Sequence, residues 1–405
     1  MNTDPLPDLS RATVSSLVYF GCFSLTLFMC TPAFVLLMAR EWHFSEASAG
    51  IVVSASVLGN TLGGLGVGSR AWQLGGRLTL FLAAAMMIGG YGIAAWGGSA
   101  PAVGVEVFVA GLGSGILSGV STRSLTYSRH PHRYLSMVAM AQNVCAALLL
   151  GVALPFVGER WGAMGGYLLI AGLVVPCLFM VGATCGEVQR ETAPAGRAAV
   201  DRLGVGALLA SQLAYYVLIG LVWTFLGTLG TENGLHADDV DRAAGASNLL
   251  ALGVCLLSPW LERSGRMRAW SMWSITLTLV GIVGMVLTHR MLGFAGWMLV
   301  MNAGWTLNGI VLQCLFPGVD PAGRFVGVTS GLTGIGFSTG AYLGGGWLET
   351  HAASSSFLSA LGLGVFAALV LFLVRKPRPE GSGNAPHRAG TSPETTSATA
   401  IRGGA

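Results

Sequence analysis

The chain has 405 residues, of which 53% are hydrophobic and only 10% carry a charge. Soluble domains carry about 25% charged residues, so this composition excludes an ordinary soluble globular protein. The formal net charge of +4 is small, and we expect no nucleic-acid partner. Glycine occurs 60 times, and small residues let helices approach closely inside a lipid bilayer.

Apolar runs long enough to cross a bilayer, which takes about 20 residues, follow one another along the chain. We identify twelve, at 13–38, 48–68, 78–97, 102–121, 135–157, 164–184, 204–229, 243–261, 269–288, 292–315, 326–347 and 355–374. The connections at 97–101 and 288–291 are very short, so these helices must be antiparallel neighbours. The predicted fold class is an all-α integral membrane protein with twelve transmembrane helices.

Arginines recur at one spacing between these runs. Pairs separated by 191 residues are Arg11 and Arg202, Arg77 and Arg268, and Arg133 and Arg324. Each pair falls at an equivalent junction between apolar runs. The chain therefore contains an internal repeat of one helical bundle, which is the usual construction of a secondary transporter. We predict six-helix bundles over 1–184 and 204–374, a cytoplasmic linker over 185–203, and a disordered cytoplasmic tail over 375–405.

The positive charges predict the orientation, because cytoplasmic loops are enriched in Lys and Arg. With both termini inside, 18 of the 22 Lys and Arg residues are cytoplasmic. The four that remain outside are Arg40, Arg160, Arg242 and Arg290. Arginine greatly outnumbers lysine, which suggests a GC-rich bacterial genome and therefore the bacterial inner membrane.

The most specific local motif is LERSGRMR, residues 261–268, between the eighth and ninth runs. An acid at a helix end can pair with a following arginine, and a glycine permits a tight turn. The motif resembles the acidic-Arg-x-Gly-Arg-x-basic loop of the major facilitator superfamily. The resemblance implies a conformational latch formed by Glu262, Arg263, Gly265, Arg266 and Arg268; a basic anchor at the inner membrane face is the alternative.

The corresponding stretch of the first half, residues 64–77, is degenerate. Ser69 stands where the family has an acid, and only Gly76 and Arg77 keep the expected end. Arg77 is the latch residue that the resemblance implies here. Residues 151–158 partly match the Gly-Pro stretch of drug antiporters in the family, but Leu154 replaces the glycine before Pro155.

Polar and aromatic residues within the seventh and tenth runs are the candidate substrate contacts. Polar groups in a membrane are costly and usually face the bundle interior, and the resemblance implies that these two runs help to line a central cavity. The candidates are Gln212, Tyr215, Tyr216, Trp223, Asn302, Trp305 and Asn308. Packing between helices uses the same residue types and stays open as the alternative. In the first run, Pro32 is expected to kink the helix.

Glu106 is the one carboxylate placed within a predicted run, and it is the candidate for ion coupling. It lies near the outer interface, so a simple solvated acid is the alternative. The sequence has neither a catalytic triad, an HExxH motif nor a phosphate loop. We therefore expect no enzyme activity, no cofactor and no bound metal.

The expected function is secondary active transport of a small organic solute by alternating access, with protons as the coupling ion. Two alternatives remain: a membrane sensor or scaffold that keeps the fold without transport, and an efflux pump for drugs or natural products. The expected partners are a small-molecule substrate, protons and the lipid bilayer, with the chain acting as a monomer.

Overall fold

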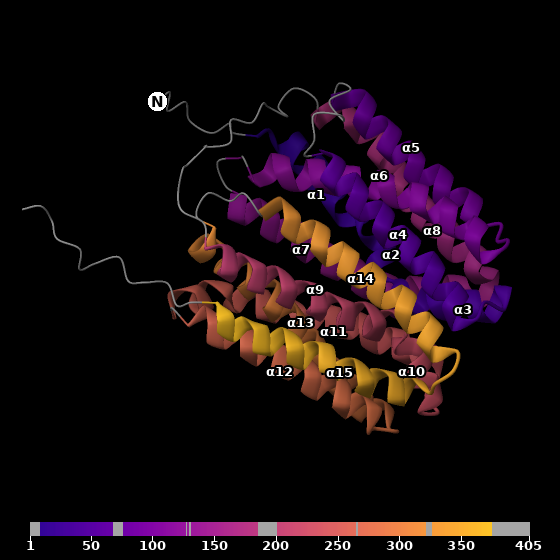
Figure 1. The fold of residues 1–405 in the computed structure, drawn as a ribbon. Coiled ribbons are helices and arrows are strands. Elements are labelled where there is room, and N and C mark those ends of the chain that lie inside the picture. The colour runs from indigo at the N-terminus through magenta and orange to yellow at the C-terminus, as the bar shows by residue number, and fades with distance from the viewer. Residues whose placement is uncertain are drawn as a thin grey trace, which may run out of the picture. The chain divides into compact units, whose positions relative to one another are not determined.

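The computed structural model describes residues 9–67, 76–126, 128, 131–184, 201–264, 266–320 and 326–374. Helices make up nearly all of this part of the chain, and no strand occurs within it. Residues Met1–Arg375 belong to one compact unit, and long helices run side by side through it (Figure 1). The predicted all-α class is confirmed.

The helices are named in chain order. In the first half of the chain they are α1 (Arg11–Ser24), α2 (Thr26–Met29), α3 (Thr31–Trp42), α4 (Glu46–Val67), α5 (Gly76–Ala94), α6 (Ala100–Thr126), α7 (Pro131–Leu148), the π-helix η2 (Leu149–Ala153) and α8 (Leu154–Thr184). In the second half they are α9 (Arg202–Thr224), α10 (Leu226–Glu232), α11 (Ala237–Arg263), α12 (Met267–Val286), α13 (Met291–Val319), α14 (Val326–Leu348), α15 (Ala353–Val370) and the 3₁₀-helix η3 (Leu371–Leu373).

The first apolar run is interrupted twice. Leu25 and Cys30 have ψ values of 12° and 9°, outside the helical range, and they separate α1, α2 and α3. Pro32 is in the first turn of α3, where its missing N–H costs no helical hydrogen bond. The expected bend at this proline therefore takes the form of a break just before it.

The fifth and sixth runs are joined without a loop. Helices α7, η2 and α8 follow one another directly, and Gly162 has φ 55° and ψ −149°, which no helix allows. Glycine tolerates this left-handed region because it lacks a Cβ atom. A stretch of 50 residues, Arg133–Gly182, qualifies as one candidate span, although about 20 residues cross a bilayer.

Within the described residues, eight helical stretches are long and apolar enough to cross a membrane. They include every predicted run except 13–38, 243–261 and 326–347. The first of these runs is divided into helices that are each shorter than a span. The count of twelve transmembrane helices stays a prediction.

The repeated arginines stand at equivalent helix starts. Arg11 opens α1 after the N-cap Ser10, and Arg202 opens α9 after the N-cap Asp201. The side chains of both caps accept a hydrogen bond from a backbone N–H of the first turn, as N-caps do. Arg77 and Arg268 lie in the first turns of α5 and α12. Arg324 lies outside the described residues.

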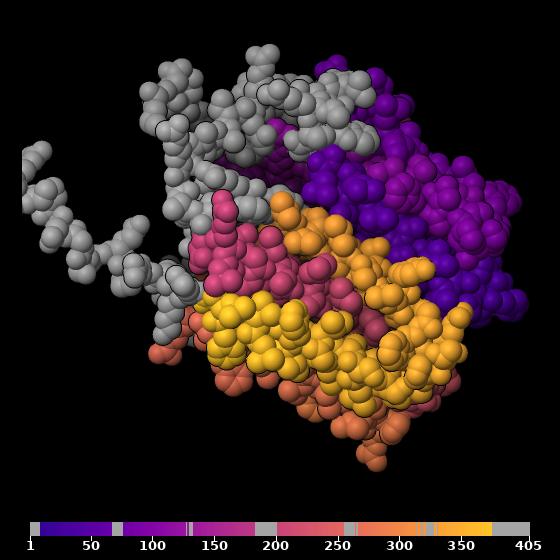
Figure 2. All heavy atoms as spheres, viewed as in Figure 1, coloured from indigo at the N-terminus to yellow at the C-terminus, as the bar shows by residue number. Residues whose placement is uncertain are grey.

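Glycines let the helices pack closely. A Cβ atom on Gly111 of α6 would collide with the Ser56 carbonyl of α4, and one on Gly345 of α14 would stand 2.5 Å from the Glu46 carbonyl of α4. The second contact joins segments far apart in the chain, and the orange surface of α14 runs beside the indigo surface of α4 (Figure 2). Helices α7 and α11 meet in the same way. The division into two six-helix bundles stays a prediction, and residues 185–200 of the predicted linker lie outside the described residues.

Candidate functional site

The seven candidate substrate contacts do not share one cavity. Gln212 and Tyr216, on one face of α9, line a small polar pocket of about 50 Å³. The rest of its wall comes from α13 and α14, through Gly309, Leu312, Phe316, Thr329 and Thr333. It lies beside the middle of α9, near the start of α14 and in the second half of α13. The nearby ends of α13 and α14 are those predicted to face the cytoplasm.

The Gln212 amide is held in place by α14. Its Nε2 donates to the Thr329 carbonyl at 2.9 Å and to the Thr333 hydroxyl at 2.7 Å. Its Oε1 is buried and has no hydrogen-bond partner. Buried polar atoms almost always have a partner, so this oxygen is free to accept a hydrogen bond from a bound solute. The Tyr216 hydroxyl faces the same threonine and the Trp305 side chain.

Trp223 and Trp305 belong to an aromatic cluster that joins the two halves of the chain. Their ring centroids are 5.3 Å apart. Phe28 of α2 lies 6.4 Å from Trp305 and 4.5 Å from Phe337 of α14, and the Trp223 Nε1 donates to the Phe28 carbonyl at 3.4 Å. These rings fill the interior between the first half and the second.

Tyr215 and Asn302 are engaged with neighbouring helices of their own half. The Tyr215 hydroxyl is 2.8 Å from the Thr278 hydroxyl of α12. The Asn302 Nδ2 donates to the hydroxyl of Ser247 at 3.0 Å and to the Asn248 Oδ1 at 3.2 Å, both on α11. These contacts favour the packing alternative for both residues.

Asn308 follows the same pattern. Its Oδ1 accepts hydrogen bonds from Ser271 and Ser274 of α12 at 3.2 and 3.0 Å, and the residue is fully buried. Such bonds between helices are a usual source of stability in membranes. Asn308 therefore connects α13 to α12 rather than to the polar pocket.

Sequence reasoning did not identify Thr329, Thr333 and Phe28. The two threonines are four residues apart on α14, so they lie on one face of a helix that is otherwise rich in glycine, and that spacing could have singled them out. Phe28 is one of several aromatic residues in its run, and no sequence signal distinguishes it.

The outer ends of the two halves are closed against each other. A Cβ atom on Gly227 of α10 would stand 2.5 Å from a methyl group of Leu36 on α3. Together with the Phe28 cluster, this contact separates the polar pocket from the predicted outer side. A solute could reach the pocket from that side only if these helices moved apart.

Glu106 lies seven residues into α6 and is half-buried. Its Oε2 is buried and has no hydrogen-bond partner. The backbone carbonyl of Glu106 packs against Gly90 of α5, where a Cβ atom would stand 2.5 Å away. Glu106 is therefore at the α5–α6 contact of the first half and does not line the polar pocket.

The described part of the latch motif shows contacts at the helix ends. The Arg268 Nη1 donates to the Val374 carbonyl at 3.0 Å, and the guanidinium lies 5.1 Å from the centre of the Phe372 ring. Arg266 and Arg77 are exposed. The side chains of Glu262 and Arg263, and the whole of Gly265, lie outside the described residues.

Comparisons with known proteins bear on the fold. No protein-family model and no curated protein matches the sequence. Solved structures match most of the chain at low identity. The inward-open xylose transporter XylE from E. coli has a TM-score of 0.69 at 14% identity, covering 92% of this chain and 96% of its own.

Two further structures agree. A mutant of the nucleoside transporter NupG has a TM-score of 0.69 at 13% identity and covers 89% and 98% of the two chains. The major facilitator superfamily proton:xylose symporter XylE, bound to 6-bromo-6-deoxy-D-glucose, has a TM-score of 0.62 at 15% identity and covers 89% and 94%. All three similar structures are of transporters, and this chain has the fold of the major facilitator superfamily.

Proposed function

We propose that this chain is a secondary active transporter that moves a small organic solute by alternating access. The observation that carries the proposal is the buried, unpartnered Gln212 Oε1 in a polar pocket. An intramembrane polar group is costly, and a solute that donates a hydrogen bond would satisfy it. The similar structures are a proton:xylose symporter and a nucleoside transporter, which supports the same class of function.

The pocket suggests which kind of solute is carried. None of its lining residues is charged, and the Tyr216 and Thr333 hydroxyls and the Gln212 amide can all form hydrogen bonds. Trp305 lies next to Tyr216 and offers a flat apolar surface. These groups suit the hydroxyl or amide groups of a neutral or weakly ionised solute. Its flat or apolar body would need more room than the 50 Å³ of this pocket, so the pocket must widen on binding.

Opening the outer side during transport would require the contacts between the two halves to break. With the halves in contact at Leu36 and Gly227, the pocket would exchange with the cytoplasmic side. Separation of α3 from α10, with the Phe28 ring leaving Trp223, would open the outer side. The loop that contains Arg266 and Arg268 would act as the latch between the two states.

Coupling to protons is part of the proposal, with Glu106 as the candidate residue because its Oε2 is buried without a partner. We propose a monomer in the bacterial inner membrane with both termini in the cytoplasm. This orientation follows from the distribution of arginines, 18 of 22 basic residues being assigned to the inner side.

Efflux is the second candidate direction. Gly151 lies within η2, and a Cβ atom on Gly245 of α11 would stand 3.0 Å from the Gly151 backbone nitrogen. The incomplete antiporter stretch thus contacts α11 of the opposite half, and relative movement of the two halves would change this contact. A flux assay in both directions separates efflux from uptake, and no flux in either direction would favour the sensor or scaffold.

Replacement of Gln212 tests the pocket. In proteoliposomes, Gln212→Leu removes the free acceptor together with the two bonds that the amide donates to α14, and we expect at least a tenfold fall in flux, about 1.4 kcal/mol or more. Ser211→Ala is the matched control, because the Ser211 hydroxyl donates to the Ala367 carbonyl of α15, away from the pocket. Equal flux in Gln212→Leu and the unmodified chain would contradict the assignment of this pocket.

A further inference from the structure

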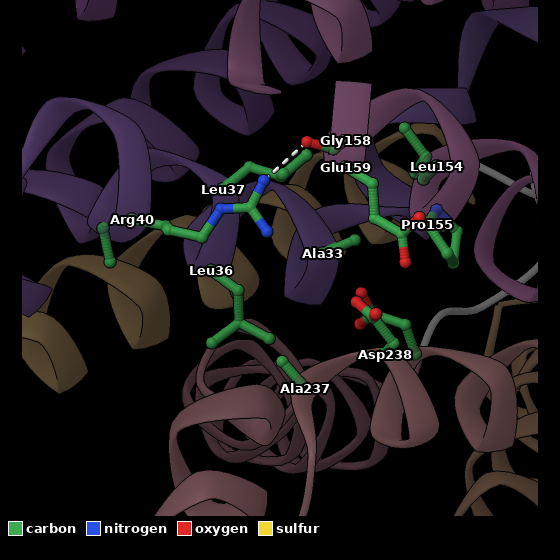
Figure 3. A pocket seen from close by; sticks show the side chains of 12 residues that line it. Ala33, Leu36, Leu37, Arg40, Leu154, Pro155, Gly158, Glu159, Ala237 and Asp238 are labelled. Carbon is green, nitrogen blue, oxygen red and sulfur yellow. Dashed lines mark hydrogen bonds between the residues drawn. The ribbon is translucent and has the colours of Figure 1, made fainter. Parts of the chain in front are cut away.

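A second and larger cavity lies at the predicted outer end of the molecule. Its volume is about 350 Å³, and α3, α8 and α11 form its walls (Figure 3). The lining residues are Ala33, Leu36, Leu37, Ala39, Arg40, Leu154, Pro155, Gly158, Glu159, Ala237, Asp238 and Asp241. Helices α3 and α8 come from the first half and α11 from the second, so the cavity spans the junction between the halves.

The cavity combines an aliphatic wall with an excess of carboxylates. Glu159 on α8 and Asp238 on α11 extend toward one another across it (Figure 3). The single arginine is already engaged, because the Arg40 Nε donates to Glu41 at 2.9 Å and its Nη2 to the Gly158 carbonyl at 2.5 Å. Acids from both halves therefore face each other with little compensating positive charge.

Asp241 is the buried member of this group. Its exposed fraction is 6%, and its Oδ1 has no hydrogen-bond partner. It lies three residues after Asp238 on α11, so the two carboxylates share one helix face. The neighbouring Asp239 differs, since it is paired with Arg242 at 3.1 Å on the exposed surface. An ionised carboxylate without a partner is costly to bury, and a cation in the cavity would remove that cost.

We propose that this cavity binds a protonated amine with a short aliphatic chain, with Asp241 as its counter-ion. An ammonium group has three N–H donors, so beside Asp241 it can bond a second carboxylate of the lining. The chain would lie against Ala33 and Leu36. Among the described residues, no three His, Cys, Asp or Glu side chains are placed to hold a metal ion, which favours an organic cation.

The bound amine would hold the outer ends of the halves together, because its contacts come from both α8 and α11. The bound amine need not be the transported solute. The amine cavity shares no lining residue with the polar pocket, so a chain that does not bind the amine could still transport its solute.

Binding should depend on pH. Asp241 lies in the second turn of α11, ahead of the apolar run 243–261, and burial together with nearby Asp238 raises its pKa to about 8. The other charged groups facing the cavity are Glu159 and Arg40. In the empty cavity Asp241 is protonated below its pKa, and an ammonium binds the ionised form. Affinity should therefore be about thirty-fold higher at pH 9 than at pH 6.5.

The test is the thermal unfolding midpoint of the purified full chain, titrated with n-butylammonium at constant ionic strength and pH 8.5. We expect a saturable rise in the midpoint. Equal concentrations of n-butanol and sodium butyrate, which match the chain length without the positive charge, should give none. The titration repeated at pH 6.5 should require a much higher amine concentration.

Variants identify the site. Asp241→Asn should abolish the saturable rise, while Asp239→Asn in the same helical turn should keep it. Glu159→Gln, at an exposed position that does not endanger folding, should weaken binding several-fold. The proposal is overturned if butylammonium acts no more strongly than butanol on the unmodified chain. It is also overturned if both Asp241→Asn and Glu159→Gln bind the amine like the unmodified chain.

Discussion

Two adjacent tyrosines show how position decides the role of a residue. Tyr215 and Tyr216 are both buried and their rings lie edge to face, 5.7 Å apart. Successive helical residues point about 100° apart, so Tyr215 reaches Thr278 of α12 while Tyr216 reaches the polar pocket. One hydroxyl holds two helices together, and the other lines the pocket beside Thr333 and Trp305.

Removing each hydroxyl should separate these roles. Tyr216→Phe should raise the KM for transport several-fold, since its hydroxyl lines the pocket, and should also lower stability somewhat, because that hydroxyl faces Thr333 and Trp305. Tyr215→Phe should leave KM unchanged and lower the free energy of unfolding by about 1 kcal/mol, because a buried hydrogen bond is lost. Flux in proteoliposomes and thermal unfolding check both. A reversed pattern would show that the pocket is misassigned.

The sequence predicted which residue types matter better than where they point. Spacing placed Gln212, Tyr215 and Tyr216 on one broad face of a helix. In the structure Gln212 and Tyr216 line the pocket, whereas Tyr215 contacts the neighbouring helix α12. Asn302 resembled a solute contact because its partners, Ser247 and Asn248, are about 55 residues away in sequence. Only tertiary structure supplies such partners.

At the scale of whole helices, run length located nearly every element, but it did not reveal the breaks. Leu25 and Cys30 interrupt the first run, and neither residue type disfavours a helix strongly. Gly162 ends one helix while Gly158 and Gly166 nearby remain helical, so glycine alone did not mark the turn. What distinguishes Gly162 is its positive φ, which depends on how the chain packs.

Neighbouring glycines at the outer end of α14 provide a test of helix packing. Gly345→Ala would place a methyl group 2.5 Å from the Glu46 carbonyl, whereas Gly346→Ala meets nothing within 4 Å. We expect Gly345→Ala to lower the free energy of unfolding by about 1–3 kcal/mol, as overpacking usually does. Gly346→Ala should leave the free energy of unfolding unchanged. Thermal unfolding of the purified variants measures both. Equal midpoints would show that α4 and α14 are farther apart than described.

At the scale of the molecule, the repeated arginines and apolar runs predicted a fold that the solved transporters share. The same features could not predict which side is closed, because closure depends on contacts such as Leu36 with Gly227 that no periodicity encodes. They also could not fix the number of crossings, since one candidate span of 50 residues, Arg133–Gly182, includes two predicted runs.

Closure of the outer side can be made permanent as a test of alternating access. In a background without native cysteines, Leu36→Cys with Gly227→Cys should be joined by a short bifunctional thiol reagent, because the two positions are in contact. We expect cross-linking to stop flux, and a reducing agent to restore it when the linker is cleavable. Each single-cysteine variant is the control, and flux that survives complete cross-linking would exclude movement at this contact.

The most direct test is flux itself. Proteoliposomes that contain the unmodified chain are incubated with a mixture of small polar metabolites under an inward proton gradient. They are then separated from the external solution, and their contents are identified by mass spectrometry. The transporter account predicts that at least one neutral or weakly ionised solute enters faster than into protein-free liposomes and faster than with Gln212→Leu. If no solute moves faster with the protein than without it, in either direction and with or without the gradient, the account is contradicted.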